Sequence, residues 1–258
     1  MQTTNSKHVF LCPLKNADEN FISYILKVAE YSPERFSYIL SFPSKPLQEN
    51  LLKKINNSCN VYLNITTTEF SRCEHWQLLP QVIEKYTGHS TFSYLFMGDE
   101  IFLETFPHET LISGQDFYLN EYFLDDVQNV KSPLKLINFM DDNKKISKVN
   151  FLIGKPCYSP LQKIIFNKRV IGLIKFDPKM PFVSDQTMVH ELISSGCTFE
   201  FISCPFYKLN QKNRSYEKTL SLSEKIRSQI YLYLKVRCYF GIPMVLIRTF
   251  LKKIGEIL

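Results

Sequence analysis

Two short segments of this chain bring carboxylates to places where they could take part in catalysis. Asp99 and Glu100 follow the apolar run 94–97, and Asp185 follows Ser184 where a segment with helical spacing begins. An acid at the end of a buried strand can hold a phosphate through a metal ion, and a second acid beside it can remove a proton. This arrangement favours an enzyme that acts on a nucleotide-activated substrate.

The elements that would position these acids alternate over the first hundred residues. Apolar runs predict strands at 9–12, 36–42, 61–65 and 93–97. Apolar residues at helical spacing predict helices at 18–29 (capped by Asp18 or Asn20), 46–55 and 75–86. This alternation is typical of a parallel, wound α/β sheet, whose ligands bind beyond the carboxyl ends of the strands. The polar segments expected to converge there are Lys15-Asn16, Ser41–Ser44 and Gly98–Glu100.

The rest of the chain is less regular. The predicted elements are strands at 110–113, 149–153 and 198–203, a helix at 186–195 between Ser184 as its N-cap and Gly196, and two tail helices separated by Pro243. The acid pairs Asp125-Asp126 and Asp141-Asp142 lie in polar stretches and are typical of solvated turns.

Composition and charge narrow the class of protein. With 258 residues, 45% of them hydrophobic and 22% charged, the chain is expected to fold as one α/β domain with a full core. The seven cysteines show no zinc-site spacing, which fits reduced thiols in a cytosol. The N-terminus has no signal-peptide pattern, and no run of about 18 apolar residues predicts a transmembrane helix. The mild net charge of +6 comes without a zinc-finger, RNP or Gly-Lys-Ser/Thr motif, so no nucleic-acid partner is expected.

The order of several motifs between residues 9 and 203 resembles that of family 2 glycosyltransferases with a GT-A fold, of the type that builds bacterial capsule, O-antigen and colanic acid. The matching segments are Pro13–Asn16, Gly98–Phe102, Ser159–Phe166, Phe176-Asp177, Ser184-Asp185 and Gly196–Ile202. The resemblance implies a Rossmann-like wound mixed sheet with helices on both faces over residues 1–215. A nucleotide-sugar half would span 1–105 and an acceptor half 106–215, followed by a basic, aromatic tail of amphipathic helices at 216–258.

The resemblance also implies an activity and a set of site residues. The enzyme would be an inverting glycosyltransferase that moves a sugar from a UDP- or GDP-sugar to a surface polysaccharide or a polyisoprenyl-linked oligosaccharide. The implied roles are donor binding by Pro13, Asn16, Ser44, Trp76, Gly98 and Asp99, coordination of Mn²⁺ or Mg²⁺ by Asp99 and Glu100, general base catalysis by Asp185, and acceptor binding by Gln162, Lys163 and His190.

The chain departs from the family pattern at four places. Basic residues often contact the diphosphate before the fourth strand, and only Arg72 lies near that stretch here. Ser41–Ser44 stands where an acid usually reads the nucleotide after the second strand, and the Asp-x-Asp motif is reduced to one aspartate followed by Glu100. Pro160-Leu161 replaces the histidine that is common in the acceptor segment. These departures leave open a degenerate, non-catalytic domain that binds a glycan or a protein partner.

Each candidate residue also has an ordinary structural interpretation. Asp99 would cap a turn, Asp185 would be stabilised by a helix dipole, and Trp76 would pack in the core. Lys163 would be solvated, and His190 would be a surface or core residue. A separate segment, Ser113–Tyr118, faintly resembles bacterial sialyltransferases, which work without a metal.

The tail is the most basic part of the chain. Between Lys225 and Leu258 there are seven basic residues and one acid, Glu256, interspersed with aromatic and aliphatic residues. Such helices suit an anionic membrane surface, and the alternative is a helix pair packed on the domain with its charges in solvent. We therefore expect a cytoplasmic protein, peripheral on the inner face of the cytoplasmic membrane if the first interpretation holds.

Overall fold

The structure is a computed structural model. The described residues are 8–43, 48–68, 70–86, 89–109, 111, 114–131, 161–210, 220–235, 237, 239 and 241–255. Among the predictions, the strand at 149–153, the Asp141-Asp142 pair, Ser44, and Ser159-Pro160 of the acceptor segment lie outside the described residues.

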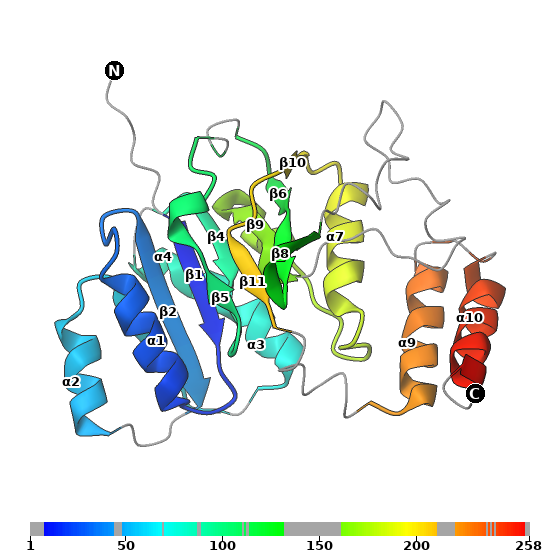
Figure 1. Cartoon of the computed structure of the whole chain (residues 1–258), viewed down its shortest axis with the longest axis horizontal. Helices are drawn as coiled ribbons and strands as arrows, with labels where there is room; N and C mark the ends of the chain where they lie inside the picture. The colour runs from blue at the N-terminus through cyan, green and yellow to red at the C-terminus, as the bar shows by residue number, and fades with distance from the viewer. Residues whose placement is uncertain are drawn as a thin grey trace.

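The main sheet has seven strands in the order β10-β6-β9-β4-β1-β2-β3 (Figure 1). Its strands are β1 (His8–Pro13), β2 (Phe36–Pro43), β3 (Val61–Thr66), β4 (Thr91–Tyr94), β6 (Phe117–Asn120), β9 (Ile164–Asn167) and β10 (Phe199–Ile202). The first four strands are parallel, as the sequence predicts, and β9 runs antiparallel to both β4 and β6. The predicted mixed, wound α/β sheet is therefore confirmed. The chain turns after Tyr94, so β4 ends earlier than predicted, and Leu111 lies in a helical turn instead of the strand predicted at 110–113.

Helices cover both faces of this sheet because alternate strand residues are apolar on both sides. One core contains Phe10 and Leu40 with helices α1 (Glu19–Ala29) and α2 (Glu49–Asn57). The opposite core contains Leu11 and Ile39 with α3, α7 and α9. The bounds of these last helices are α3 (Arg72–Leu78), α7 (Ser184–Ser194) and α9 (Leu222–Lys235). Two-sided burial is what continuous apolar strands in a parallel sheet require.

Two helix starts differ from their predictions. The helix predicted at 75–86 begins at Arg72, where Ser71 and Glu74 form a capping box, and passes through a 3₁₀ turn (η1, Leu79–Val82) into α4 (Ile83–Tyr86). Pro80 lies in that turn and has no N–H to donate. Ser184 is not the N-cap of α7, because it is the first helical residue and its hydroxyl donates to the carbonyl of Pro181. In contrast, Asp18 caps α1 as predicted, accepting from Phe21 N at 2.7 Å.

A second, small sheet packs beside the first and was not predicted. Its order is β5-β11-β7-β8, and its strands are β5 (Glu100–Ile101), β7 (Tyr122–Leu124), β8 (Asp126–Lys131) and β11 (Tyr207–Leu209). Strands of two or three residues are too short for a periodic signal. The Asp125-Asp126 pair lies at the turn between β7 and β8 and is exposed, as predicted.

The tail forms two helices, α9 and α10 (Gly241–Gly255), at one end of the molecule (Figure 1). Pro243 does not separate them, because it lies in the first turn of α10, where a missing N–H is tolerated. Leu232 and Tyr233 of α9 are fully buried in the same core as α7, so the tail packs on the domain through α9. Within the described residues, no helix is long and apolar enough to cross a membrane.

Candidate functional site

The carboxyl ends of three neighbouring strands form a row of polar positions. Pro13 of β1 pairs with Ser41 of β2, and Ser41 pairs with Asn64 of β3. Leu14 N donates to Ser41 O at 2.8 Å, which keeps the loop after β1 against β2. The start of the loop after β1 therefore lies beside the end of β2, while the predicted segment Ser41–Ser44 ends outside the described residues. Asn16 is exposed in the loop that leads to α1.

The hydroxyl of Ser41 is the centre of a hydrogen-bond network at this edge. Asn64 Nδ2 donates to Ser41 Oγ at 2.9 Å, and His75 Nε2 lies 2.7 Å from the same oxygen. Burial lowers the pKa of His75 to about 4, so the imidazole is neutral at pH 7. A neutral network thus stands where the family places an acid. Asn64 was not among the predicted site residues, although it stands near the end of the predicted strand 61–65, which pairs with the strand that carries Ser41.

Asp99 lies on the turn after β4 and points into the protein. It is 6% exposed, and Gly98 before it has φ +85°. The hydroxyl of Tyr207 donates to Asp99 Oδ2, and the backbone N–H of Asn210 donates to Oδ1 at 3.2 Å. Asn210 Nδ2 also donates to Gly98 O at 2.6 Å. Asp99 therefore ties the turn after β4 to the end of β11, and both of its oxygens accept hydrogen bonds from within the chain.

Glu100, the second predicted metal ligand, forms an ion pair on the surface. It pairs with Lys208 across β5 and β11, and its carboxylate lies 2.7 Å from Lys208 Nζ. The described residues contain no group of three or more His, Cys, Asp or Glu side chains that could hold a metal ion. Since Asp99 and Glu100 are each engaged by other groups, this donor set does not fit a divalent metal site.

Lys163, a predicted acceptor-binding residue, is fully buried. Its ammonium lies 3.8 Å from the ring centroid of Tyr122 and 5.6 Å from that of Tyr207, the tyrosine that donates to Asp99. The Lys163 charge is thus stabilised by cation–π contacts inside the small-sheet interface and is not presented to an acceptor. Its neighbour Gln162 is half-buried.

Asp185, the predicted base, is half-buried in the first turn of α7, next to the start of α3. The Cys73 thiol donates to Ser184 Oγ at 3.4 Å, which joins the two helix starts. Burial raises the pKa of the Cys73 thiol, the hydrogen bond to Ser184 and the charge of Arg72 lower it, and the charges of Asp177 and Asp185 raise it. Asp185 Oδ1 accepts from Gln186 N at 2.9 Å. Asp185 therefore lies in the first turn of α7, beside the point where α7 contacts the start of α3.

Trp76, predicted to line the donor site, is a core residue. Its ring is 6% exposed and contacts Phe96 and Phe176 at centroid distances of 5.2 and 5.4 Å. The guanidinium of Arg72 lies 4.1 Å from the ring centroid, so Trp76 holds this cation at the start of α3. The structural interpretation of Trp76 as a packing residue therefore holds.

His190 lies on α7 five residues after Asp185, which places the two about 140° apart around a helix with 3.6 residues per turn. Its Nε2 is 3.4 Å from Ser194 Oγ. His190 and Asp185 therefore lie on different faces of α7.

The segment that resembles sialyltransferases has a structural role here. Although partial burial opposes it, hydrogen bonds from Thr198 and Arg169 hold the pKa of Asp116 below its ordinary value. Arg169 Nε and the backbone and hydroxyl of Thr198 all donate to the carboxylate of Asp116. Asp116 thereby joins the ends of β6, β9 and β10.

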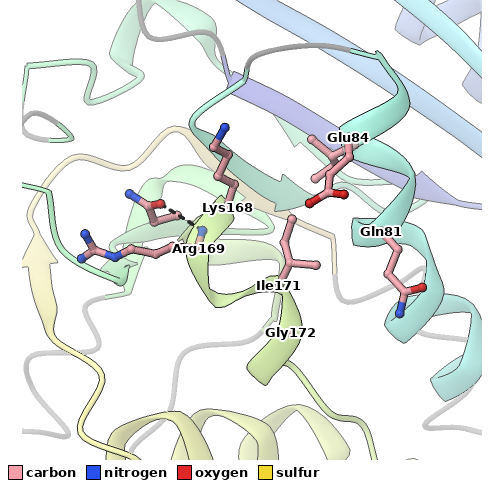
Figure 2. A pocket seen from close by; sticks show the side chains of 8 residues that line it. Gln81, Glu84, Lys168, Arg169, Ile171 and Gly172 are labelled. Atoms are coloured by element: carbon pink, nitrogen blue, oxygen red, sulfur yellow. Dashed lines mark hydrogen bonds between the residues drawn. The ribbon is translucent and has the colours of Figure 1, made fainter.

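A surface hollow lies at the opposite end of the strands (Figure 2). Its lining residues are Gln81, Ile83, Glu84, Asn167, Lys168, Arg169, Ile171 and Gly172. Asn167 pairs with Thr91 at the start of β4, so the hollow is at the amino ends of the parallel strands and away from Asp99. Ligands of wound sheets bind at the other end, and this hollow is not part of the candidate site.

Comparison with known proteins relates the fold to solved structures. No protein-family model matches the chain, and no curated protein matches it. The structure is similar to S. aureus TarS 1–349 in complex with UDP-GlcNAc, with a TM-score of 0.62, 12% identity, and coverage of 89% of this chain and 66% of that one. The complex of TarS 1–349 with UDP gives a TM-score of 0.59 at 13% identity, covering 89% of this chain and 65% of that one.

A longer TarS structure gives a TM-score of 0.60 at 13% identity, covering 89% of this chain. This chain spans about two thirds of the length of TarS 1–349 and 39% of the longer TarS chain. The chain therefore has a GT-A-like glycosyltransferase fold.

Proposed function

We propose that this protein is a glycosyltransferase that binds a nucleotide sugar at the carboxyl edge of β1, β2 and β3. The observation that carries the proposal is the network of Ser41, Asn64 and His75 at that edge. The GT-A-like fold supports it, as do the two TarS structures of similar fold that were solved with UDP and UDP-GlcNAc. Edges of this kind are where wound sheets hold nucleotides.

The chemistry of the network suits an uncharged base. Uracil presents two carbonyl oxygens and one N–H, which amide, hydroxyl and neutral imidazole groups can match without the desolvation cost of a carboxylate. We therefore propose a UDP-sugar as the donor, and a GDP-sugar is the second choice. Pro13, Asn16 and Gly98 border the same edge and would contact the donor through backbone and side-chain polar groups.

In the proposed reaction, Asp185 acts as the general base. The acceptor hydroxyl oxygen attacks the anomeric carbon while Asp185 removes its proton, and the bond from that carbon to the diphosphate oxygen breaks. The nucleoside diphosphate leaves with the electron pair, and the configuration at the anomeric carbon inverts. Gln162 is the proposed acceptor contact, and His190 is left out because it lies on a different face of α7 from Asp185. The proposed acceptor is a surface glycan or a polyisoprenyl-linked oligosaccharide.

No step of this proposal passes through a metal ion. A divalent metal is expected from the family resemblance, but Asp99 and Glu100 do not form a fitting donor set. Arg72 at the start of α3, which is held by the ring of Trp76, is the proposed cation of the site. Such a cation would favour the charge that develops on the leaving diphosphate.

Calorimetric titration of UDP, GDP and CMP into the wild type and Asn64→Leu tests the proposal. We expect UDP to bind the wild type and to bind Asn64→Leu about tenfold more weakly, since about 1.4 kcal/mol is lost with one hydrogen-bonding group. The control is Gln128→Leu, a polar-to-apolar change on the exposed strand β8. Binding of CMP alone would favour a sialyltransferase-like enzyme, and absence of binding to all three would favour a non-catalytic domain.

A further inference from the structure

Helix α9 is fastened to the body of the molecule. The Tyr231 hydroxyl donates to the carboxylate of Asp177, and Lys235 Nζ lies 2.6 Å from the Glu191 carboxylate on α7. The side chains that α9 buries are Ser228, Leu232 and Tyr233. This helix is therefore a fixed base for whatever packs against it.

Helix α10 packs on α9 at the end of the molecule, away from the sheet (Figure 1). Gly241 and Val245 are buried, and Ile242 contacts the core. These positions form one stripe along the helix. The contact with α9 thus accounts for one face of α10 only.

The opposite face of α10 is also apolar and is open to solvent. Its side chains are between 41% and 65% exposed, and they are Met244, Leu246, Ile247, Phe250 and Leu251. On a helix with 3.6 residues per turn these five positions fall within one arc of about 160°. A helix at the surface of a soluble protein normally has polar residues on its solvent-facing side. The exposed apolar side chains therefore indicate that this face of α10 is an interaction surface.

The charge of this part of the sequence indicates what covers the face. The segment 236–255 contains Arg237, Arg248, Lys252 and Lys253 and no acid. Two copies of the chain joined through this face would bring two basic segments together, which is unfavourable. A surface that is both apolar and negatively charged matches them, and a bilayer with anionic headgroups has both properties.

We propose that α10 lies in the plane of an anionic membrane, with Met244, Leu246, Ile247, Phe250 and Leu251 at the boundary between headgroups and acyl chains. The fixed contact of α9 with α7 then holds the GT-A-like body against the bilayer. This inference does not depend on the proposed function. If the enzyme uses a polyisoprenyl-linked acceptor, however, the same contact brings the body to the lipid that carries it.

Flotation of the full chain with vesicles tests the inference. One set of vesicles is phosphatidylcholine alone, and the other contains added phosphatidylglycerol. We expect the wild type to float with the anionic vesicles, to float less with the neutral ones, and to be released at high salt. The double variant Ile247→Ser/Phe250→Ser should bind at least about tenfold more weakly, because two large apolar side chains no longer enter the interface.

The matched control is Val127→Ser/Leu173→Ser, which removes two exposed apolar side chains far along the chain from α10. It should bind like the wild type, and thermal melts and UDP affinity should be unchanged in both double variants. Equal flotation of the α10 variant and the wild type would overturn the inference. So would a wild-type dimer that ignores anionic vesicles and dissociates in the α10 variant, since the face would then be a contact between copies.

Discussion

The polar side chains at the ends of β2 and β3 differ from those at the end of β4 in their charge and in their hydrogen-bond partners. At the end of β2 and β3, Ser41, Asn64 and His75 form a neutral network at the edge of the sheet. At the end of β4, Asp99 is buried, and its oxygens accept from Tyr207 and Asn210. The acid predicted to bind the metal is engaged within the fold. At the ends of β2 and β3 the partly exposed side chains of Asn64 and His75 carry no charge, while Ser41 is buried between them. An acid at a strand end therefore indicates a ligand only when no donor of the chain already occupies it.

The largest effect is expected for Asp185, the acid that stays at the edge of the site. Asp185→Asn removes the proposed proton acceptor and should lower turnover about 10²- to 10⁴-fold, with UDP affinity and stability unchanged. Initial rates with a UDP-sugar and a glycan acceptor measure the effect, and Asp126→Asn on exposed β8 is the control. If the Asp185→Asn enzyme were as active as the wild type, Asp185 would not be the general base.

Loss of the Asp99 carboxylate should act on stability. Asp99→Ala leaves the Tyr207 hydroxyl and the Asn210 N–H buried without their acceptor, so the free energy of unfolding should fall by about 3 kcal/mol. Urea unfolding measures it. Glu100→Ala, the neighbouring acid in a solvent-exposed ion pair, should cost less than about 1 kcal/mol. If the two variants were equally stable, the hydrogen bonds of Asp99 to Tyr207 and Asn210 would not stabilise the fold.

The neutral network should make stability depend on pH. Burial lowers the pKa of His75 from 6.5 to about 4, so between these values the unfolded chain binds a proton that the folded chain does not. The free energy of unfolding is therefore highest above about pH 6.5 and falls as the pH drops towards 4. The expected decrease is about 2 kcal/mol, because solvent screening at the partly exposed ring reduces the effect. Unfolding of the wild type and His75→Gln between these pH values checks it. The slope should be smaller in His75→Gln, and identical slopes would assign the pH dependence to other groups.

Much of the first half of the fold could be predicted from the sequence because its strands are long apolar runs with helices between them. β1, β2 and β3 and the Asp18 cap match their predictions closely. β5, β7 and β11 could not be found, since a strand of two or three residues has no period.

The candidate site was less predictable because the partners of its side chains are far away in the sequence or lie on strands too short to predict. Asp99 and its donor Tyr207 are 108 residues apart, so only the completed fold reveals that the carboxylate is engaged. Lys163 is similar, because its aromatic partners come from strands that have no sequence signal. Asn64 was accessible in principle, because the order of parallel strands places it beside Ser41.

The most direct test of the central claim is a calorimetric titration of UDP into the wild-type protein, once in EDTA and once in Mn²⁺. If the nucleotide is held by the neutral edge while Asp99 serves the fold, UDP binds with the same affinity in both buffers. Binding that requires Mn²⁺, and that is lost in a folded Asp99→Asn variant, would contradict the account and return Asp99 to the role of a metal ligand.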